Sequence, residues 1–521
     1  MKSLFKLTTS FCLSITPLIS HGGESEQQSH PNIVVIYADD LGYGDVSCYN
    51  PDRGKISTPH IDQLAKEGIM FTDAHSSSAV CTPSRYTLLT GRYHWRSRLQ
   101  KGIVTLWERP LITPDRLTVA SLAKRKGYRT ACVGKWHLGW NWPITEDKKK
   151  FFKSGGYRGK KDLVVTEQHR EAWRETFSKP IKGGPTAVGF DLYFGTDVPN
   201  WPPYCFIEND RTVGIPSEYG DQSLFAKNMA SQQGPALKGW TLEPILPALV
   251  DRSTKFIETA SKASEPFLLY IPLTTPHTPL SVNELWKGKS GINALADLVM
   301  ETDAAVGSIL EALKKSGAAQ NTLVIFTSDN GSAHYAGVPE QEEKGHFPSG
   351  PLRGYKADAW EGGHRVPFVV RWPSMVTAGK TSDALVHQAD LMATFADLLG
   401  IELDENEGED SFSLLPLFKN EQKSVRTHSV STSIKGIPSI RSNSWKFIPV
   451  PGSGGWGKGG DQSQPTQLYD LSKDIAEQNN LAAKNPNKVS EMKDLLELLI
   501  QNGRSNDGPK QENDVRVTRH H

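Results

Sequence analysis

The feature that most constrains the fold is a set of short apolar segments, each of which leads directly into polar residues. The first covers residues 32–38 (NIVVIYA) and is followed by Asp39 and Asp40. A β-branched run of this length is typical of a strand that is buried on both faces of a sheet. The pattern recurs over 129–133, 267–273 and 323–327, which lead into GKWHLG, TTPH and SDNG.

Helical segments alternate with these strands. The spacing of apolar residues predicts helices over 117–126, 247–262 and 295–315. Thr58-Pro59 has the form of an N-cap followed by proline at the first helical position. Alternating strands and helices predict an α/β fold with a mainly parallel sheet that helices flank on both faces.

Departures from this alternation divide the chain. Residues 141–245 contain lysine runs, Gly-Gly and Pro-Pro pairs and several tryptophans, so we interpret them as a long insertion in a main α/β domain over 31–400. The acidic stretch ELDENEGED marks a boundary. Residues 411–501 are predicted to form a small C-terminal α+β domain of antiparallel sheet plus helix, and the polar tail, 502–521, is predicted to be disordered.

The N-terminus resembles a secretory signal peptide. Lys2 and Lys6 precede an apolar stretch over 7–19, so residues 1–22 are predicted to direct export to the periplasm or the medium and to be removed. No apolar run elsewhere reaches the roughly 18 to 20 residues that cross a bilayer. The sequence therefore predicts an exported protein without a membrane span.

Overall charge excludes one class of partner. The chain has 59 Lys and Arg against 58 Asp and Glu, a formal net charge of +1. A chain with so little net charge has no global field that attracts nucleic acid or an acidic membrane. Local groups must therefore bind any anionic ligand.

The polar residues that follow the strands are expected to converge, because ligands of open α/β sheets bind outside the carboxyl ends of the strands. These residues are Asp39, Asp40, Lys135, His137, His277, Asp329 and Asn330. The aspartates and the asparagine offer only hard oxygen ligands, which favour calcium or magnesium over zinc or copper. A helix cap or a turn is the alternative for either pair alone, but two such pairs at strand ends favour a metal site.

Cys81 lies at the predicted start of a helix. In CTPSR, Pro83 and Ser84 have the form of a helix start, and Gly91 ends the helix. Backbone N–H groups and the helix dipole at such a position attract anions and favour a nucleophilic thiolate. A buried, inert cysteine is the alternative.

These segments carry a resemblance to a known family. CTPSR followed by TLLTGRY resembles the C-x-P-S-R signature of the formylglycine-dependent, arylsulfatase-like sulfatases of the alkaline phosphatase superfamily. NIVVIYADDLGYGD, GKWHLG, PHTP, SDNG and LRGYKADAWEGGHRVP resemble the family as well, in order over about 31–400, and QLYDLSKDIAEQNNL resembles its small second domain. The resemblance implies an alkaline-phosphatase-like fold and hydrolysis of sulfate esters.

The resemblance also implies a modified residue and roles for its neighbours. A formylglycine-generating maturation enzyme would oxidise Cys81 to Cα-formylglycine (3-oxoalanine), whose hydrate attacks sulfur. Calcium would be held by Asp39, Asp40, Asp329, Asn330 and the side chain at 81. Arg85 would orient the nucleophile and His137 would take its proton. Lys135 and Lys356 would neutralise the sulfate, while His277 would protonate the leaving oxygen. Glu361 and the two glycines after it are interpreted as structural support.

The motifs leave the substrate open. Trp140 and Trp201, in or beside the insertion, would stack on sugar rings, and His334 would meet a polar substituent, although packing of the tryptophans against their own loops is the alternative. We expect a sulfated carbohydrate such as ulvan, carrageenan, fucoidan or a glycosaminoglycan. A phosphomonoester or phosphonate hydrolase of the same fold remains an alternative, as does a non-catalytic sulfated-glycan-binding protein if Cys81 is not matured.

Overall fold

A ten-stranded sheet forms the centre of the molecule. The computed structural model describes residues 1, 30–153, 164–220 and 231–520, so the predicted signal peptide lies outside the described residues apart from Met1. The strands follow the order β12-β2-β11-β10-β1-β9-β3-β4-β5-β6. Their bounds are β1 Asn32–Asp39, β2 Ile69–His75, β3 Arg129–Lys135, β4 Leu192–Thr196, β5 Ile207–Glu208, β6 Arg211–Thr212, β9 Phe267–Pro276, β10 Thr322–Ser328, β11 Phe368–Arg371 and β12 Lys380–His387.

The middle of this sheet is parallel, as predicted. β10, β1, β9, β3 and β4 are successive parallel neighbours, whereas β11 runs antiparallel to β10 and β5 runs antiparallel to β4. The four strands predicted from apolar runs are thus the four adjacent central strands β10, β1, β9 and β3. Their carboxyl ends lie at one edge, which brings the residues that follow them together.

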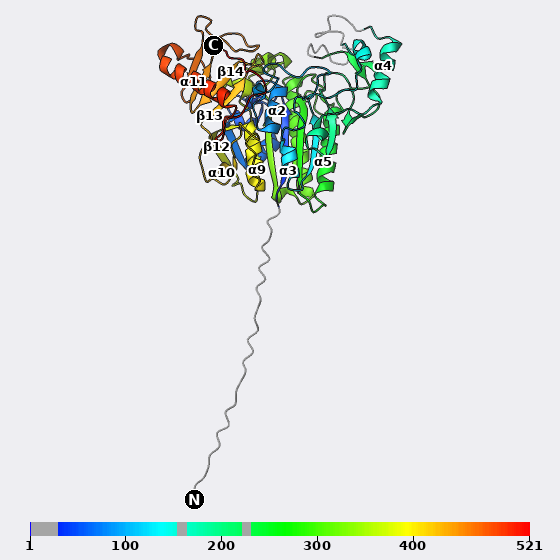
Figure 1. Ribbon diagram of the computed structural model, residues 1–521, viewed down its shortest axis with the longest axis horizontal. Helices are drawn as coiled ribbons and strands as arrows, with labels where there is room; N and C mark the ends of the chain where they lie inside the picture. The colour runs from blue at the N-terminus through cyan, green and yellow to red at the C-terminus, as the bar shows by residue number, and fades with distance from the viewer. Residues whose placement is uncertain (2–29, 154–163, 221–230, 521) are drawn as a thin grey trace.

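Helices cover both faces of the sheet (Figure 1). One face packs on α1 (Pro59–Lys66), α5 (Ile245–Ala260) and α6 (Ala294–Lys315), and the other on α2 (Cys81–Thr90), α3 (Val119–Lys124) and α9 (Leu391–Leu399). Along β1, Ile33 and Val35 belong to the core under α2, while Val34 and Ile36 belong to the core under α6. Because side chains alternate between faces, a strand buried on both sides is apolar at every position.

The 141–245 region extends the sheet, which corrects its interpretation as an insertion alone. It supplies β4, which pairs in parallel with β3, and then β5 and β6. It also contains α4 (Glu167–Phe177) and a small sheet of β7 (Glu218–Gly220) and β8 (Gly234–Ala236). β4 is five residues long and includes Gly195, so it has no continuous apolar run; backbone pairing with β3 places it in the sheet.

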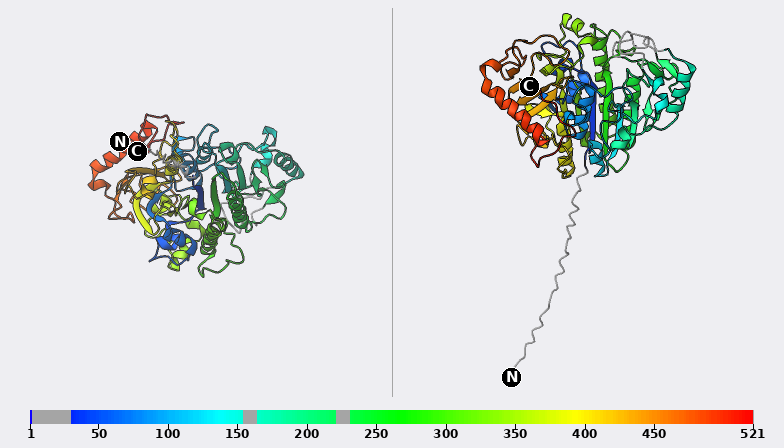
Figure 2. Two further views of the ribbon diagram at one scale, coloured as in Figure 1. Left: turned by 90° about the horizontal axis from the view of Figure 1, so that it is seen from below. Right: turned by 45° about the horizontal axis from the view of Figure 1, so that its top comes forward.

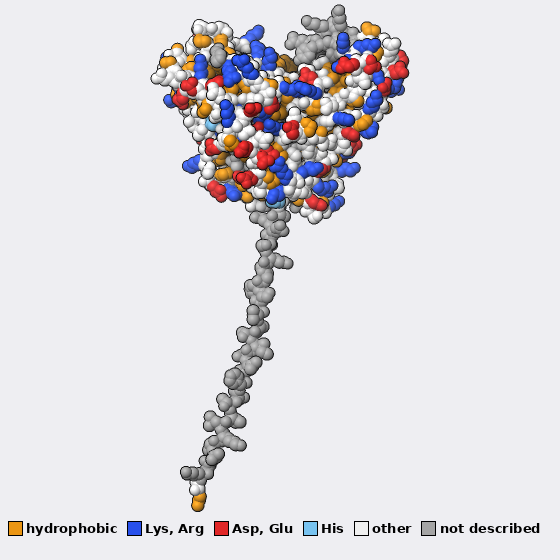
Figure 3. Space-filling model, viewed as in Figure 1, with side chains coloured by type: hydrophobic (Ala, Val, Ile, Leu, Met, Phe, Trp, Pro, Cys, Tyr) orange, Lys and Arg blue, Asp and Glu red, His pale blue; other side chains and the backbone are white. Residues whose placement is uncertain are grey.

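The predicted C-terminal unit of antiparallel sheet plus helix is present. Its strands are β13 (His428–Thr432), β14 (Pro438–Ser442), β15 (Trp445–Ile448) and β16 (Gln467–Asp470), with α11 (Pro486–Asn502) packed on β14 and β15. The remaining short helices are α7 (Val338–Glu343), α8 (Glu361–His364) and α10 (Leu415–Phe418). Both views in Figure 2 show the C-terminal unit and α4 on opposite sides of the main sheet. Figure 3 shows a hollow between these two lobes in the upper outline of the molecule.

The acidic stretch 402–410 and the tail 502–520 are packed against the main domain, which differs from the predicted disorder of the tail. Asp410 pairs with Arg96 at 2.8 Å, and Glu409 pairs with Arg92 at 3.0 Å. Of the tail, Val517 is 6% exposed, and Asp514 N donates to Arg96 O at 2.8 Å. The polar residues of these segments contact arginines that lie far away in the sequence, and these contacts hold the segments in place. No helix among the described residues is long and apolar enough to cross a membrane.

Candidate active site

The polar residues at the strand ends converge at one edge of the sheet. Asp39 ends β1 and Lys135 ends β3, and Lys135 Nζ donates to Asp39 Oδ2 at 2.8 Å. Asp329 and Asn330 follow β10, which pairs directly with β1, whereas β9 lies between β1 and β3. Asp40 N donates to Asp329 Oδ1 at 3.0 Å, and Asn330 Nδ2 donates to Asp40 Oδ1 at 2.8 Å. Parallel pairing therefore brings together acids that are about 290 residues apart.

Three cations balance the three carboxylates. Lys356 Nζ lies 2.7 Å from each oxygen of Asp40. Arg85 Nη2 lies 2.8 Å from Asp329 Oδ2 and 3.4 Å from Asp39 Oδ1. Since the local charges cancel, a bound divalent cation would leave net positive charge for an anionic ester.

The pKa values reflect this crowding. Burial raises the pKa of Asp329 well above its usual value, and the neighbouring charge of Asp39 raises it further. Burial would also raise the pKa of Asp39, but Lys135 and His277 hold it well below the usual range. Carboxylates packed so closely repel one another, and a cation bound between them would relieve that repulsion.

Two ligand atoms support a metal at this site. Asn330 Oδ1 and Asp39 Oδ1 are buried and accept no hydrogen bond from the described residues, and Asp39 Oδ1 has only the ion pair with Arg85 at 3.4 Å. A buried oxygen without a partner is costly, whereas an oxygen-rich site with spare lone pairs suits calcium. The donor set therefore fits the predicted ion.

Cys81 begins α2, as predicted, and is 3% exposed. All ten residues of the helix are buried, so the segment CTPSR lies within the protein rather than on its surface. The helix brings Arg85, one turn later, to Asp329, and Thr82 Oγ1 donates to His137 O at 3.0 Å. The same short helix thus places position 81 and ties it to the other walls of the site.

The two predicted catalytic histidines are buried in different surroundings. His137 Nε2 lies 3.1 Å from Val104 O, which can only accept, so Nδ1 is the free acceptor nitrogen; it has no partner among the described residues. His277 Nδ1 lies 2.5 Å from Thr278 O, and its Nε2 lies 3.6 Å from Asp40 Oδ2. Burial and then Lys135 lower the pKa of His137 to about 3, while burial and then Lys356 lower the pKa of His277 to about 4.

Several non-glycine residues at this edge of the sheet have strained backbone conformations with positive φ. Asp40, His137 and Ala357 have φ values of 66°, 54° and 80°, although none is glycine. Each is a site residue or the neighbour of one. Such conformations cost free energy and persist where the surrounding structure enforces them, which is typical of functional sites.

The predicted sugar-binding residues lie in three different environments. Trp140 is 0% exposed and packs on Trp142 and Tyr193 with ring centroids 6.0 and 5.5 Å away, so it has no face for a sugar and that expectation is wrong. Trp201 is 6% exposed and meets His137 edge-on at 5.4 Å. His334 is exposed and lies against Tyr355, with ring centroids 5.0 Å apart.

Tyr335 and Trp456, which were not predicted from the sequence, form an exposed aromatic pair beside the segment that carries Lys356. The glycine-rich segment around Trp456 is the signal that could have drawn attention to it.

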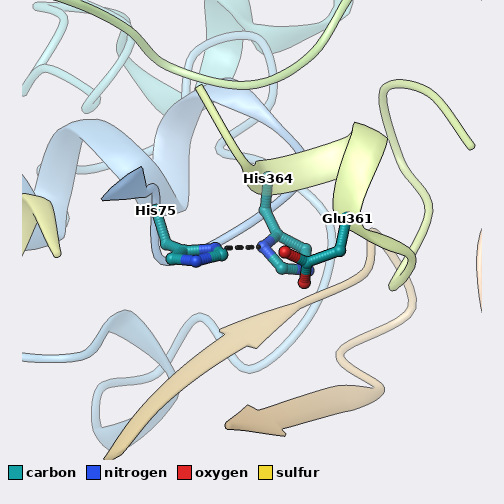
Figure 4. A group of neighbouring side chains, drawn as sticks. All are labelled: His75, Glu361 and His364. Carbon is teal, nitrogen blue, oxygen red and sulfur yellow. Dashed lines mark hydrogen bonds and ion pairs between the residues drawn. The ribbon is translucent and has the colours of Figure 1, made fainter. Parts of the chain in front are cut away.

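A second cluster of potential metal ligands has a structural role. His75, Glu361 and His364 lie together in Figure 4, with His75 Nδ1 3.1 Å from His364 Nδ1. Glu361 is already paired with Lys446 at 2.9 Å and with Arg365 at 3.2 Å. Because these cations occupy the carboxylate, the cluster links the main domain to β15 of the C-terminal sheet and is a poor metal site. This arrangement agrees with the interpretation of Glu361 as structural support.

Comparisons with known proteins agree with this geometry. The family model described as Sulfatase matches residues 31–401, and the model for the C-terminal part of N-sulphoglucosamine sulphohydrolase matches residues 356–504. An N-acetylgalactosamine-6-O-sulfatase from Bacteroides thetaiotaomicron is 33% identical over 91% of this chain and 94% of its own length. Human arylsulfatase A is 32% identical over 90% of this chain and 88% of its own length.

Solved structures extend the likeness to three dimensions. One, described under the metabolism of multiple glycosaminoglycans by Bacteroides thetaiotaomicron, superposes with a TM-score of 0.77 at 31% identity, covering 90% of this chain and 99% of that chain. Another, Ps i-CgsB in complex with k-i-k-neocarrahexaose, gives a TM-score of 0.67 at 26% identity, covering 93% and 95% of the two chains. The chain belongs to the sulfatase family and is a sulfuric ester hydrolase.

Proposed function

We propose that this sulfatase hydrolyses sulfate esters of a sulfated carbohydrate, with Cα-formylglycine at position 81 and calcium bound by Asp39, Asp40, Asp329 and Asn330. The observation that carries this proposal is the position of Cys81. It begins a buried helix whose next turn carries Arg85, which lies 2.8 Å from Asp329, and the neighbouring Thr82 donates to His137 O at 3.0 Å. A nucleophile formed there would lie within the ring of carboxylates and cations.

Calcium would supply positive charge that polarises a sulfate oxygen and the nucleophile. Asp39 and Asn330 support this assignment because each has a buried oxygen without a hydrogen-bond partner among the described residues. Lys135 and Lys356, which now neutralise Asp39 and Asp40, would then bind the remaining sulfate oxygens.

The modified side chain would supply two hydroxyls on one carbon, one to attack sulfur and one whose deprotonation later releases sulfate. Arg85 would hold that carbon in place from one turn along α2. His137 would accept the proton at Nδ1, since its Nε2 faces the Val104 carbonyl. Burial favours the neutral ring of His137, and only the neutral ring can accept a proton at Nδ1.

His277 would act on the leaving oxygen. Its Nδ1 faces the Thr278 carbonyl, so only a protonated ring can donate from Nε2. Burial disfavours that form in the resting site, but an anionic ester beside Nε2 would favour it. The proton would therefore be taken up together with the substrate and passed to the departing alcohol.

The substrate class rests on the named relatives. An N-acetylgalactosamine-6-O-sulfatase and a structure holding a neocarrahexaose are both similar to this chain over nine-tenths of its length. We also propose export, which the pattern of Lys2, Lys6 and residues 7–19 supports, and modification by a formylglycine-generating enzyme, which CTPSR supports.

The decisive experiment combines a mass spectrum with an assay. The protein is produced with and without a formylglycine-generating enzyme, and the mass of the peptide that contains residue 81 is measured. Sulfate release is then followed from ulvan, carrageenan, fucoidan and glycosaminoglycan oligosaccharides, with a chelator and after calcium is restored.

Only matured, calcium-loaded protein should release sulfate, and Cys81→Ala should be inactive. Cys81→Ser should at most retain sulfate on the protein, because its single hydroxyl leaves no second proton to remove. Full turnover by protein that retains unmodified Cys81 would refute the mechanism.

A further inference from the structure

Two exposed aromatic side chains lie together near the active site. Tyr335 is 48% exposed and Trp456 is 51% exposed, and no other Phe, Tyr or Trp among the described residues is as exposed. Their ring centroids are 5.9 Å apart, and the ring planes meet at 61°. The pair thus forms an exposed aromatic corner, in which Tyr335 comes from the main domain and Trp456 from the C-terminal unit.

Trp456 is held by backbone contacts to the segment that carries Lys356. Asp358 Oδ1 accepts from Trp456 N at 3.1 Å and from Gly457 N at 2.7 Å. A Cβ at Gly455 would lie 2.1 Å from Ala357 O, so the loop approaches this segment too closely for any other residue. The backbone of Trp456 is therefore fixed beside Asp358, which lies two residues after Lys356, and these contacts leave the indole ring unused.

Tyr335 reaches toward the same site from the other side. It lies five residues after Asn330, in the 3₁₀ turn His334–Ala336. Burial raises the pKa of its hydroxyl, and Lys356 and Asp40 are near enough to shift that pKa in opposite directions. Half of the side chain is nevertheless exposed. The turn follows Ser332, whose carbonyl accepts from Lys356 N at 3.0 Å, so Tyr335 lies near the segment that carries Lys356 while about half of the residue faces solvent.

We propose that Tyr335 and Trp456 form a subsite for the sugar ring that carries the scissile sulfate. Trp456 covers an apolar face of the pyranose, and the Tyr335 hydroxyl binds a neighbouring ring substituent. This inference rests on the proposed carbohydrate substrate and replaces the Trp140 stacking site, which is buried.

A purely structural role accounts less well for this corner. Side chains that serve only to join two lobes bury their apolar area against each other, whereas about half of each of these side chains stays exposed. The loop is already joined to the main domain by its backbone, including a hydrogen bond of 2.7 Å from Ala359 N to Ser453 O. The exposed aromatic surface is therefore available to a ligand that is held at the sulfate by Lys356.

The test compares two substrates across matched variants of the matured, full-length enzyme. The variants are Trp456→Ala, Trp456→Phe and Tyr335→Phe, with Leu498→Ala on α11, which is also 51% exposed, as the control. kcat/KM is measured with the best sulfated oligosaccharide of the panel and with 4-nitrocatechol sulfate, and thermal unfolding checks each fold.

Trp456→Ala should lower kcat/KM for the oligosaccharide by about tenfold or more, largely through KM, and change that for the aryl sulfate by less than about twofold. Trp456→Phe should recover part of the loss, and Leu498→Ala should change neither substrate. Tyr335→Phe keeps the ring, so it should lose only the contribution of the hydroxyl.

Equal losses on the two substrates, or none on the oligosaccharide, would overturn the subsite. Failure of the proposed function is seen separately, because the wild-type enzyme would then hydrolyse the aryl sulfate but release no sulfate from any oligosaccharide of the panel. Calorimetry with the desulfated product and Cys81→Ala protein gives a second measurement, in which Trp456→Ala should weaken binding.

Discussion

Among single residues, Asp329 connects most of the active site. It accepts from Asp40 N and from Arg85, and its carboxylate is one of the proposed calcium ligands. Asp329→Ala should therefore release the metal and lower kcat/KM by at least about 100-fold. Metal analysis of the purified variant and steady-state kinetics check both effects.

Asp303→Asn is the matched control. Asp303 is also a buried acid, but it accepts from Ile61 N at 2.8 Å at the start of α1 and is not one of the proposed calcium ligands. That variant should lose stability and keep its metal. Stoichiometric calcium in Asp329→Ala protein would show that the ligand assignment is wrong.

His94 makes stability depend on pH. It is 1% exposed, and burial lowers its pKa to about 3 from an ordinary value near 6.5. The unfolded chain therefore binds a proton that the native protein excludes, so stability is lost as pH falls below about 6.5. At pH 5 this one residue should cost about 2 kcal/mol relative to pH 7.

Urea unfolding at the two pH values measures this difference. His94→Gln should reduce it by about the stated amount, whereas Leu498→Ala, at an exposed residue that does not titrate, should leave it as it is. If both variants kept the wild-type difference, other groups would be responsible for the acid sensitivity.

Among the elements, the strands that the sequence could predict are those buried on both faces. β1, β9 and β10 contain long apolar runs and β3 a short one over 131–133, and the acids of the site lie at the ends of two of these strands. β2, β4 and β12 were missed because exposed or polar positions interrupt them, and their place depends on pairing with strands far along the chain. Trp456 could not be predicted for the same reason, since contacts between two separate units bring it to the site.

Gly134 controls the strand that presents Lys135. Its φ is 148°, and a Cβ there would lie 1.9 Å from Pro272 O on β9. Gly134→Ala should therefore destabilise the protein by at least about 3 kcal/mol and displace Lys135. Gly127, just before the same strand, has a φ of 75° with open space around its Cβ position. Gly127→Ala should cost only about 1 kcal/mol in the same denaturant titration, and equal costs would refute the steric argument.

Across the whole molecule, the chain end holds the main domain to the C-terminal unit. Arg92 pairs with Asp514 at 3.0 Å, Arg96 Nη1 donates to Asn513 at 3.0 Å, and Val517 is buried. Ending the chain at Lys510 should therefore lower the free energy of unfolding by about 2 to 4 kcal/mol, because arginines lose partners and apolar surface is exposed. Thermal or urea unfolding of the truncated protein measures the loss, and unchanged stability would contradict it.

The same contacts set an order of events during synthesis. Arg92 lies just beyond the helix that begins with Cys81, and 422 residues separate it from Asp514. A ribosome adds that length in roughly 20 to 80 s at ordinary elongation rates. Until then the segment CTPSR lacks part of the framework that encloses it, so the proposed maturation enzyme would have a limited time in which Cys81 is accessible. Folded protein with unmodified Cys81 should accept the modification far more slowly than nascent or urea-unfolded chains do, and mass spectra taken over time would show the difference.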